Sequence, residues 1–261
     1  MTGQTASQRP RLVLVHGWAQ HAGIWQAWRE RLAPIADMTA VDLPGHGGTP
    51  WKNAIRSLDA LADSVLPALE QPAALCGWSL GGMIAMNLAR RHPSRVTRLV
   101  LCNTTPRFVA GHDWIHAVQP SLVEGFRRRV SENPERVLRD FLSLQLRGES
   151  DSRQTLTLLR SALTDQNRPR AAALEFTLSL LAQTDLRDEL AAIAPPTLVI
   201  ASDADAITPL AAGEYLARQL PDARLLTVTG CGHAGFLSRP ERLSPGLDEF
   251  LSGKSVQEMA S

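Results

Sequence analysis

The stretch that decides the fold runs from Ala73 to Arg90 and reads Ala-Ala-Leu-Cys-Gly77-Trp-Ser79-Leu-Gly81-Gly-Met-Ile-Ala-Met-Asn-Leu-Ala-Arg. A short apolar run ends in Gly-x-Ser-x-Gly, and the residues from Met83 onward have the composition of a helix. A serine at a tight turn between strand and helix projects its hydroxyl from the carboxyl edge of a sheet. Ser79 is therefore the candidate nucleophile. Taken alone, the motif is equally compatible with a plain flexible turn, so the assignment depends on the rest of the chain.

The stretch Arg11–Val15 is a β-branched run without a polar face, which predicts a strand covered by helices on both sides. His16-Gly17-Trp18 follows it directly. In this context the backbone N–H groups of Trp18 and Leu80 are the expected donors to an oxyanion. His16 could be read as a base, but we interpret it as a hydrogen-bonded structural residue at a strand end.

Further strands and helices alternate before and after the serine. We expect helices at Ile24–Leu32 and Ser57–Leu69 and strands at Met38–Val41 and Arg95–Cys102. The turn between Asp42 and Gly48 holds Asp42 and His46, a possible second acid and base. We interpret them as residues that bond local backbone and shape the turn.

From 107 to 188 the strand signals stop and helical spacing takes over. Four helices are predicted, at Leu122–Val130, Pro134–Leu146, Ser152–Thr164 and Ala171–Gln183. We expect 1–106 and 189–261 to form one α/β core and 107–188 to be a helical cap, or lid, inserted into it. A separate helical domain is the alternative, and the absence of a flexible linker on either side disfavours it.

The chain then returns to strands, at Pro196–Ala201 and Ala223–Thr229, with helices expected at Leu210–Leu220 and Pro240–Leu251. An acid follows the first of these strands and His233 follows the second. Serine, then acid, then histidine is the chain order of an α/β-hydrolase triad. We choose Asp205 as the acid because it stands four residues before Pro209, as in Gly-x-x-Asp-x-x-x-Pro with serine replacing the glycine. Asp203 is the alternative acid; otherwise it caps the turn or faces solvent.

These signals predict an α/β-hydrolase fold with a mostly parallel central sheet of six or seven strands, flanked by helices. In the expected mechanism His233 takes the proton of Ser79 and later gives it to the leaving alcohol, while Asp205 holds the histidine in the right tautomer. This chemistry needs no metal and no organic cofactor.

Composition narrows the function further. Lys+Arg number 27 against 26 Asp+Glu, so the chain lacks the general basic field expected of a nucleic-acid binder. The first ten residues are polar, and no window approaches the roughly 18 apolar residues of a membrane span. The three cysteines have no metal-like spacing and predict buried thiols. We expect a cytoplasmic protein, most simply a monomer, that binds neither nucleic acid nor membrane.

Five short motifs, taken together, resemble one particular family of α/β-hydrolases. They are His16-Gly-Trp18, Asp42-Leu-Pro-Gly45, Gly77-Trp-Ser-Leu-Gly-Gly82, Phe141-Leu-Ser-Leu-Gln145 and Thr184-Asp-Leu-Arg187. From about Arg11 to Leu251 the chain resembles the pimeloyl-acyl carrier protein methyl ester carboxylesterases of biotin synthesis. The elbow and the first turn are shared by many α/β-hydrolases, whereas the cap segment and the Trp of the first loop are more particular.

The resemblance implies a substrate, a partner and a binding site. The substrate would be a pimeloyl methyl ester carried on acyl carrier protein, and small esters would also be hydrolysed. Trp18 and Leu80 would contact the substrate, and five cap residues would line the acyl channel: Phe141, Leu142, Ser143, Leu144 and Gln145.

Arginine is enriched locally in the expected cap. Ten arginines stand between 125 and 170 against six acids. Such residues usually form solvated helix faces. Acyl carrier proteins are acidic, however, and the resemblance places carrier-binding arginines at Arg136 and Arg153; we add Arg139 and Arg160 to this predicted contact.

Other functions remain compatible with the same motifs. Within enzymes these are a generalist short-chain carboxylesterase or lactonase and a C–C bond hydrolase; a dehalogenase would need Asp at position 79. From another class, the chain could be a non-catalytic ligand receptor on a hydrolase scaffold.

Overall fold

The computed structural model describes residues 9–149, 152–162 and 167–253. Their centre is one six-stranded sheet with the order β2-β1-β3-β4-β5-β6, in which every pair of neighbours is parallel. The strands are β1 (Arg11–Val15), β2 (Asp37–Val41), β3 (Ala73–Trp78), β4 (Val96–Cys102), β5 (Thr197–Ser202) and β6 (Ala223–Val228). The predicted α/β fold is confirmed, and the sheet has the smaller of the two expected strand counts among the described residues.

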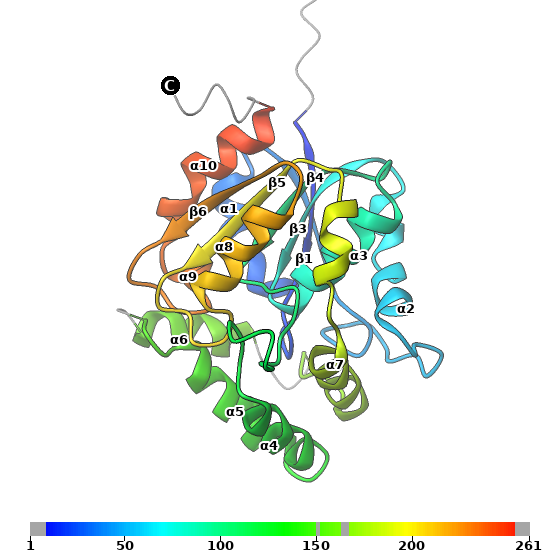
Figure 1. Ribbon diagram of the computed structural model, residues 1–261, viewed down its shortest axis with the longest axis vertical. Coiled ribbons are helices and arrows are strands. Elements are labelled where there is room, and N and C mark those ends of the chain that lie inside the picture. The colour runs from blue at the N-terminus through cyan, green and yellow to red at the C-terminus, as the bar shows by residue number, and fades with distance from the viewer. Residues whose placement is uncertain (1–8, 150–151, 163–166, 254–261) are drawn as a thin grey trace, which may run out of the picture.

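Two helical layers cover the sheet (Figure 1). Alternate residues of each strand enter opposite cores: Val13 and Leu75 belong to one cluster, Leu14 and Cys76 to the other. Because both faces of β1, β3 and β5 are buried, these strands are almost uninterrupted apolar runs in the sequence. The first cluster packs under α2 (Leu58–Asp63), α3 (Leu80–Arg91) and α8 (Leu210–Gln219), and the second under α1 (Gln26–Leu32), α9 (Gly235–Ser238) and α10 (Pro240–Ser252).

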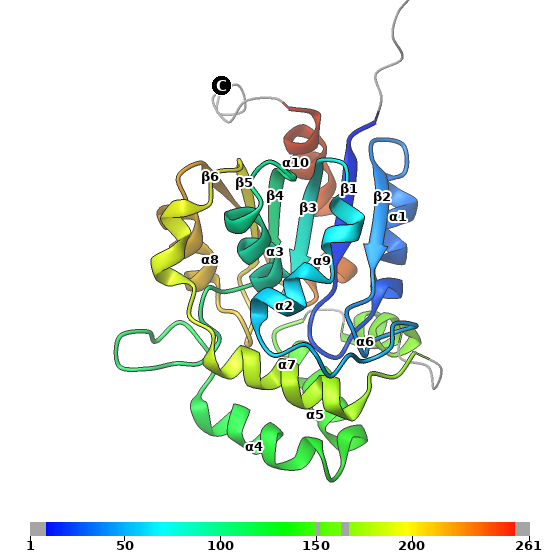
Figure 2. The ribbon, with the colours of Figure 1, turned by 90° about the vertical axis from the view of Figure 1, so that its right-hand side faces the viewer.

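Four further helices separate β4 from β5. These cap helices are α4 (Pro120–Val130), α5 (Pro134–Gln145), α6 (Ser152–Ala162) and α7 (Ala171–Gln183), each close to its predicted bounds. The last two residues of the predicted Ser152–Thr164 helix lie outside the described residues. The strand arrows point toward this group of helices, which therefore lies across the carboxyl edge of the sheet (Figure 2).

Two expected helices are interrupted. The predicted Ser57–Leu69 helix is α2 followed by a 3-10 turn, η2 (Leu66–Leu69), because Pro67 has no N–H to continue the helical ladder. The predicted Ile24–Leu32 helix begins instead as a 3-10 turn, η1 (Ala22–Trp25). A third 3-10 helix, η3 (Arg187–Ala192), leads back from the cap to β5. No helix among the described residues is both long and apolar enough to cross a membrane.

Candidate active site

Ser79 occupies a strained turn between β3 and α3. Its backbone angles, φ 56° and ψ −118°, lie where residues with a side chain are rarely found. The neighbouring glycines make the turn possible: a Cβ on Gly77 would lie 2.1 Å from the carbonyl oxygen of Gly81, and one on Gly81 2.3 Å from that of Val15. The tight backbone therefore explains both glycines of the motif and places Ser79, which is buried, at the carboxyl end of β3.

Neighbouring groups hold the backbone of Ser79 in this conformation. Its N–H donates to the Cys102 carbonyl at 3.1 Å, and the Thr104 hydroxyl donates to the Ser79 carbonyl at 2.7 Å. Both partners follow or end β4, the strand beside β3. The nucleophile is thus fixed from the adjacent strand as well as by its own turn.

Asp205 and His233 meet at the same edge of the sheet. Asp205 follows β5, His233 follows β6, and both are buried. The Nδ1–H of His233 donates to Oδ2 of Asp205 at 2.8 Å. The other ring nitrogen, Nε2, has no hydrogen-bond partner among the described residues and is free to receive a proton. A contact from a serine hydroxyl to such a nitrogen often tightens only when substrate binds.

The Asp205 carboxylate is surrounded by donors. Oδ2 also accepts from the Thr208 hydroxyl at 2.6 Å and from Nδ2 of Asn103 at 2.9 Å. Oδ1 accepts the backbone N–H groups of Ile207 and Thr208 at 2.8 and 2.9 Å. Burial acts to raise the pKa of Asp205, but the adjacent His233 and these side-chain hydrogen bonds outweigh burial and lower it. The carboxylate therefore stays charged and able to stabilise a histidine cation.

Asp203, the alternative acid, points elsewhere. It is exposed, and its Oδ1 accepts the N–H of Gly230 at 2.8 Å, which closes the turn after β6. The geometry therefore favours Asp205 over Asp203 as the partner of His233.

The two expected oxyanion donors are available. Neither the Trp18 N–H nor the Leu80 N–H makes a hydrogen bond to another described group. Leu80 opens α3, where helical N–H groups lack partners and carry partial positive charge. The Trp18 indole donates to the Leu174 carbonyl at 3.2 Å, and its ring lies edge-on to Phe141 with centroids 4.8 Å apart. Trp18 thus joins the loop after β1 to two cap helices, α5 and α7.

The predicted acyl-channel segment lies in the last turns of α5, and four of its five residues are buried. The fifth, Ser143, is a correction: it is exposed, and its hydroxyl donates to the carbonyl of Arg139 one turn earlier. Successive helical residues point about 100° apart, so five in a row cannot all line one channel. Gln145 is fully buried; its carbonyl accepts the N–H of His233 at 3.3 Å, and its side-chain amide has no partner among the described residues.

The histidines near the first loop have structural contacts. Nε2 of His16 accepts the Leu43 N–H at 3.1 Å, and Nδ1 lies 2.8 Å from the Gly17 carbonyl. The ring of His46 bonds the Pro44 carbonyl at 3.1 Å. Burial and the neighbouring His46 lower the pKa of His16, and burial lowers the pKa of His46 to about 4.

Asp42 completes this loop network. Its two carboxylate oxygens accept the N–H groups of Ala22 and Gly48 at 2.6 and 3.1 Å. These contacts agree with the interpretation of Asp42, His16 and His46 as residues that shape the loops.

Four residues near the site were not singled out from the sequence: Asn103, Thr104, Thr208 and Gln20. The polar run Asn103-Thr104-Thr105 directly after a buried strand was a usable signal, because carboxyl ends of parallel strands converge. Gln20 is buried with both amide atoms unpartnered among the described residues, which makes it a further candidate for substrate contact. A glutamine inside a loop gave no such signal in the sequence.

The cap arginines expected to meet a carrier protein lie on the surface. Arg136, Arg153 and Arg160 are exposed and form no ion pair with the described acids, whereas Arg139 reaches Glu135 at 3.9 Å. Asp151 and Asp165, the acids nearest α6 in sequence, lie outside the described residues.

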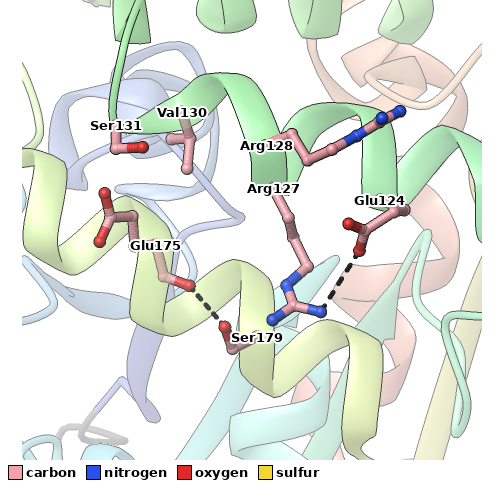
Figure 3. A pocket seen from close by; sticks show the side chains of 7 residues that line it. All are labelled: Glu124, Arg127, Arg128, Val130, Ser131, Glu175 and Ser179. Carbon is pink, nitrogen blue, oxygen red and sulfur yellow. Dashed lines mark hydrogen bonds and ion pairs between the residues drawn. The ribbon is translucent and has the colours of Figure 1, made fainter.

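A hollow of about 370 Å³ lies between α4 and α7 (Figure 3). Its walls are Glu124, Arg127, Arg128, Val130, Ser131, Glu175 and Ser179. Arg127 pairs with Glu124 at 3.5 Å, and the Ser179 hydroxyl donates to the Glu175 carbonyl at 2.9 Å. None of the predicted site residues lines this hollow.

Comparison with known proteins gives a consistent result. A family model described as alpha/beta hydrolase fold matches residues 10–240. The chain is 42% identical over 250 residues to the pimeloyl-[acyl-carrier protein] methyl ester esterase of Aromatoleum aromaticum, covering 94% of this chain and 99% of that protein. It is 38% identical over 239 residues to the protein of the same name from Nitrosomonas europaea, covering 92% of this chain and 94% of that protein. An esterase from Exiguobacterium antarcticum shares the fold, with a TM-score of 0.84 at 20% identity over 94% of this chain and 92% of that one.

Proposed function

The chain belongs to the α/β-hydrolase family, and we propose that it is a serine carboxylesterase that hydrolyses the methyl ester of pimeloyl-acyl carrier protein in biotin synthesis. The observation that carries the chemistry is the buried Asp205–His233 pair at the edge of the sheet where Ser79 follows β3; Nε2 of His233 has no hydrogen-bond partner among the described residues. The likeness to named esterases over nearly the whole chain supports the choice of substrate.

In the proposed reaction the Ser79 hydroxyl attacks the ester carbonyl while His233 Nε2 takes its proton. The tetrahedral oxyanion is held by the N–H groups of Trp18 and Leu80, a contribution of roughly 10²–10³ in rate for each donor. Collapse breaks the bond to the methoxy oxygen, which receives the proton from His233 and leaves as methanol. Water, deprotonated by His233, then attacks the acyl-enzyme and releases the pimeloyl carboxylate and free Ser79.

The buried side of α5 suits the acyl chain in this reaction. Phe141, Leu142 and Leu144 are apolar, and Gln145 adds a buried side-chain amide that has no partner among the described residues. We propose that these residues, with Trp18, line the channel under a lid formed by 107–188. The exposed arginines of α5 and α6 would receive the acidic carrier protein outside the channel. Cys76, Cys102 and Cys231 are free thiols, which supports action in the reducing cytoplasm, and we propose a monomer.

The direct test is methanol release from methyl pimeloyl-acyl carrier protein by the purified protein, with Ser79→Ala as the inactive control. We expect turnover of the carrier-bound ester, covalent labelling of Ser79 by an organophosphonate, and rescue of a biotin auxotroph that lacks its methyl ester esterase. Hydrolysis of p-nitrophenyl butyrate without carrier-bound turnover or rescue would indicate a generalist esterase instead. If the protein neither hydrolyses esters nor is labelled at Ser79, it is a ligand receptor and not an esterase.

A further inference from the structure

The residues at the end of β4 connect the proposed nucleophile to the proposed acid. The Cys102 carbonyl and the Thr104 hydroxyl both bond the backbone of Ser79, at 3.1 and 2.7 Å. Between them, the N–H of Asn103 donates to the Ile200 carbonyl of β5 at 2.8 Å. Because β4 lies between β3 and β5 (Figure 2), the tripeptide Cys102–Thr104 connects the strands that carry the proposed nucleophile and the proposed acid.

Asn103 itself is buried and held in one orientation. Its φ of 41° is in the left-handed region, which asparagine tolerates better than most residues. A carboxylate can only accept, so the amide must present Nδ2 to Asp205, at 2.9 Å. The opposite end, Oδ1, accepts from the Cys102 thiol at 3.7 Å. Burial, together with Cys76 and Asp205, raises the pKa of Cys102, so that thiol keeps its proton and remains a donor.

Resting on the proposed triad, we propose that Asn103 is a positioning residue that orients the Asp205 carboxylate and sets the pH at which His233 becomes a free base. Both side chains donate to the same oxygen, Oδ2 of Asp205. The hydrogen bond from Asn103 partly neutralises the negative charge on Oδ2. Less of that charge is then available to stabilise a positively charged His233. Asn103 thereby favours the neutral histidine that the reaction requires.

Other groups also face the Asp205–His233 pair and are kept constant in the test. The Thr208 hydroxyl donates to the same Oδ2 atom at 2.6 Å, lies 3.3 Å from Nδ1 of His233, and is unchanged in the variants below. Glu149 accepts the N–H of Gly232 at 3.2 Å, and Asp203 lies in the turn before Asp205. The buried thiols of Cys102 and Cys231 complete the titratable groups near the pair on the described segments; the carbonyl of Cys231 accepts the N–H of Ala204, next to Asp205, at 3.2 Å.

The test compares two variants that lack the donor but differ in volume. Asn103→Gly accepts the left-handed backbone, whereas Asn103→Leu supplies side-chain bulk without an N–H at a φ that leucine tolerates less well than asparagine. The readout is kcat/KM for p-nitrophenyl butyrate against pH, which reports the free enzyme. In both variants we expect the midpoint of the acid limb to move upward by roughly half a unit or more, with lower kcat/KM at neutral pH.

A control and two contrary outcomes keep the test decisive. Thr105 ends the same segment and its hydroxyl donates to the Arg107 carbonyl at 2.7 Å without touching Asp205, so Thr105→Ala should lower the melting temperature and leave the midpoint in place. An unmoved midpoint in Asn103→Gly, or a wild-type profile in Asn103→Leu, would reduce Asn103 to a packing residue. Full activity in Asp205→Asn would instead overturn the triad itself, which separates the two failures.

Discussion

Asp205 keeps a negative charge in a place from which water is excluded, and five hydrogen bonds make that possible. A buried charge is tolerated only when it is paired and fully hydrogen-bonded. Asp203, two residues earlier, is exposed and bonds a turn N–H, so its charge has no comparable function. The two acids of one short loop are therefore distinguished by their surroundings and not by their chemical type.

This difference gives the first prediction. Ser79→Ala and His233→Ala should each remove nearly all ester hydrolysis, because the residues act as one unit. Asp205→Asn should lower kcat by several orders of magnitude, since an amide cannot stabilise the histidine cation. Asp203→Asn should change kcat less than a few fold. The measurement is hydrolysis of p-nitrophenyl butyrate by variants whose circular dichroism matches wild type; a reversal of the two aspartates would refute the assignment.

His46 gives a second prediction, which concerns stability. Its pKa of about 4 in the folded protein lies below the ordinary value near 6.5, so the unfolded chain binds the extra proton between those limits. Stability is therefore fully present above pH 6.5 and decreases as the pH falls toward 4. For His46 alone the loss at pH 5 is about 2 kcal/mol.

Urea unfolding at about pH 7.5 and about pH 5 measures this effect. In His46→Asn, which can still donate to the Pro44 carbonyl, the loss of unfolding free energy between the two pH values should shrink by up to about 2 kcal/mol. The matched control is His112→Asn, since the His112 side chain is 97% exposed and its substitution should leave the pH dependence as in wild type. Equal pH dependence in His46→Asn and wild type would contradict the prediction.

At the scale of secondary structure, the elbow works because two backbones approach closely where Cβ atoms are absent. A methyl group at Gly77 would meet the backbone of α3, which has no side-chain freedom to move aside. Gly125 differs: it lies inside α4, and a Cβ there would meet nothing within 4 Å. The same residue type is therefore required in one element and unfavourable in the other.

The third prediction compares these two glycines. Gly77→Ala should abolish esterase activity and destabilise the protein, because the turn that presents Ser79 must move. Gly125→Ala should raise the free energy of unfolding by about 0.5–1 kcal/mol, the propensity difference in a helix interior, with activity unchanged. Thermal unfolding and p-nitrophenyl butyrate hydrolysis check both. A fully active Gly77→Ala variant would show that the elbow tolerates the shift.

The sequence was informative about elements and less so about contacts. Periodicity located six strands and four cap helices, since each pattern reflects burial on one or two faces. Pro67 was visible and should have divided the predicted Ser57–Leu69 helix. Ser143 does not fit its predicted place in the acyl channel because five consecutive residues of a helix point in different directions, and the motif alone does not show which of them point inward. Asn103 and Thr208 were missed because their role depends on which strand ends are neighbours.

For the whole molecule, the strand order determines where the site forms. The chain moves from β1 to one neighbour, β2, and then returns to place β3 on the other side of β1. At such a switch point loops separate and leave a crevice at the carboxyl ends. Trp18 follows β1 and Ser79 follows β3, so the proposed oxyanion loop and the proposed nucleophile border this point. The cap helices lie over the same edge of the sheet (Figure 2).

The exposed arginines of the cap helices concern the proposed partner, an acidic acyl carrier protein. Arg136 on α5 and Arg153 on α6 are exposed and lack an ion-pair partner among the described acids, although the chain as a whole is nearly neutral. Arginine suits an acidic partner because its planar fork can grip a carboxylate or phosphate with two hydrogen bonds. Complementary charge of this kind mainly accelerates encounter and is screened by salt.

The last prediction is that Arg136→Glu with Arg153→Glu lowers kcat/KM for the carrier-bound methyl ester by roughly tenfold or more, because attraction of the acidic carrier becomes repulsion. The wild-type rate should also fall as salt rises from about 0.02 to about 0.5 M, whereas the double variant should lose that dependence. Turnover of p-nitrophenyl butyrate should barely change in either protein, since a neutral small ester does not need the arginines. The matched control is Arg29→Glu with Arg56→Glu, an equal charge change at two exposed arginines outside the cap that also have no ion pair with the described acids, which should leave carrier-bound turnover near wild type. If the cap variant loses both activities equally, or neither, these arginines are structural and the carrier-protein contact lies elsewhere.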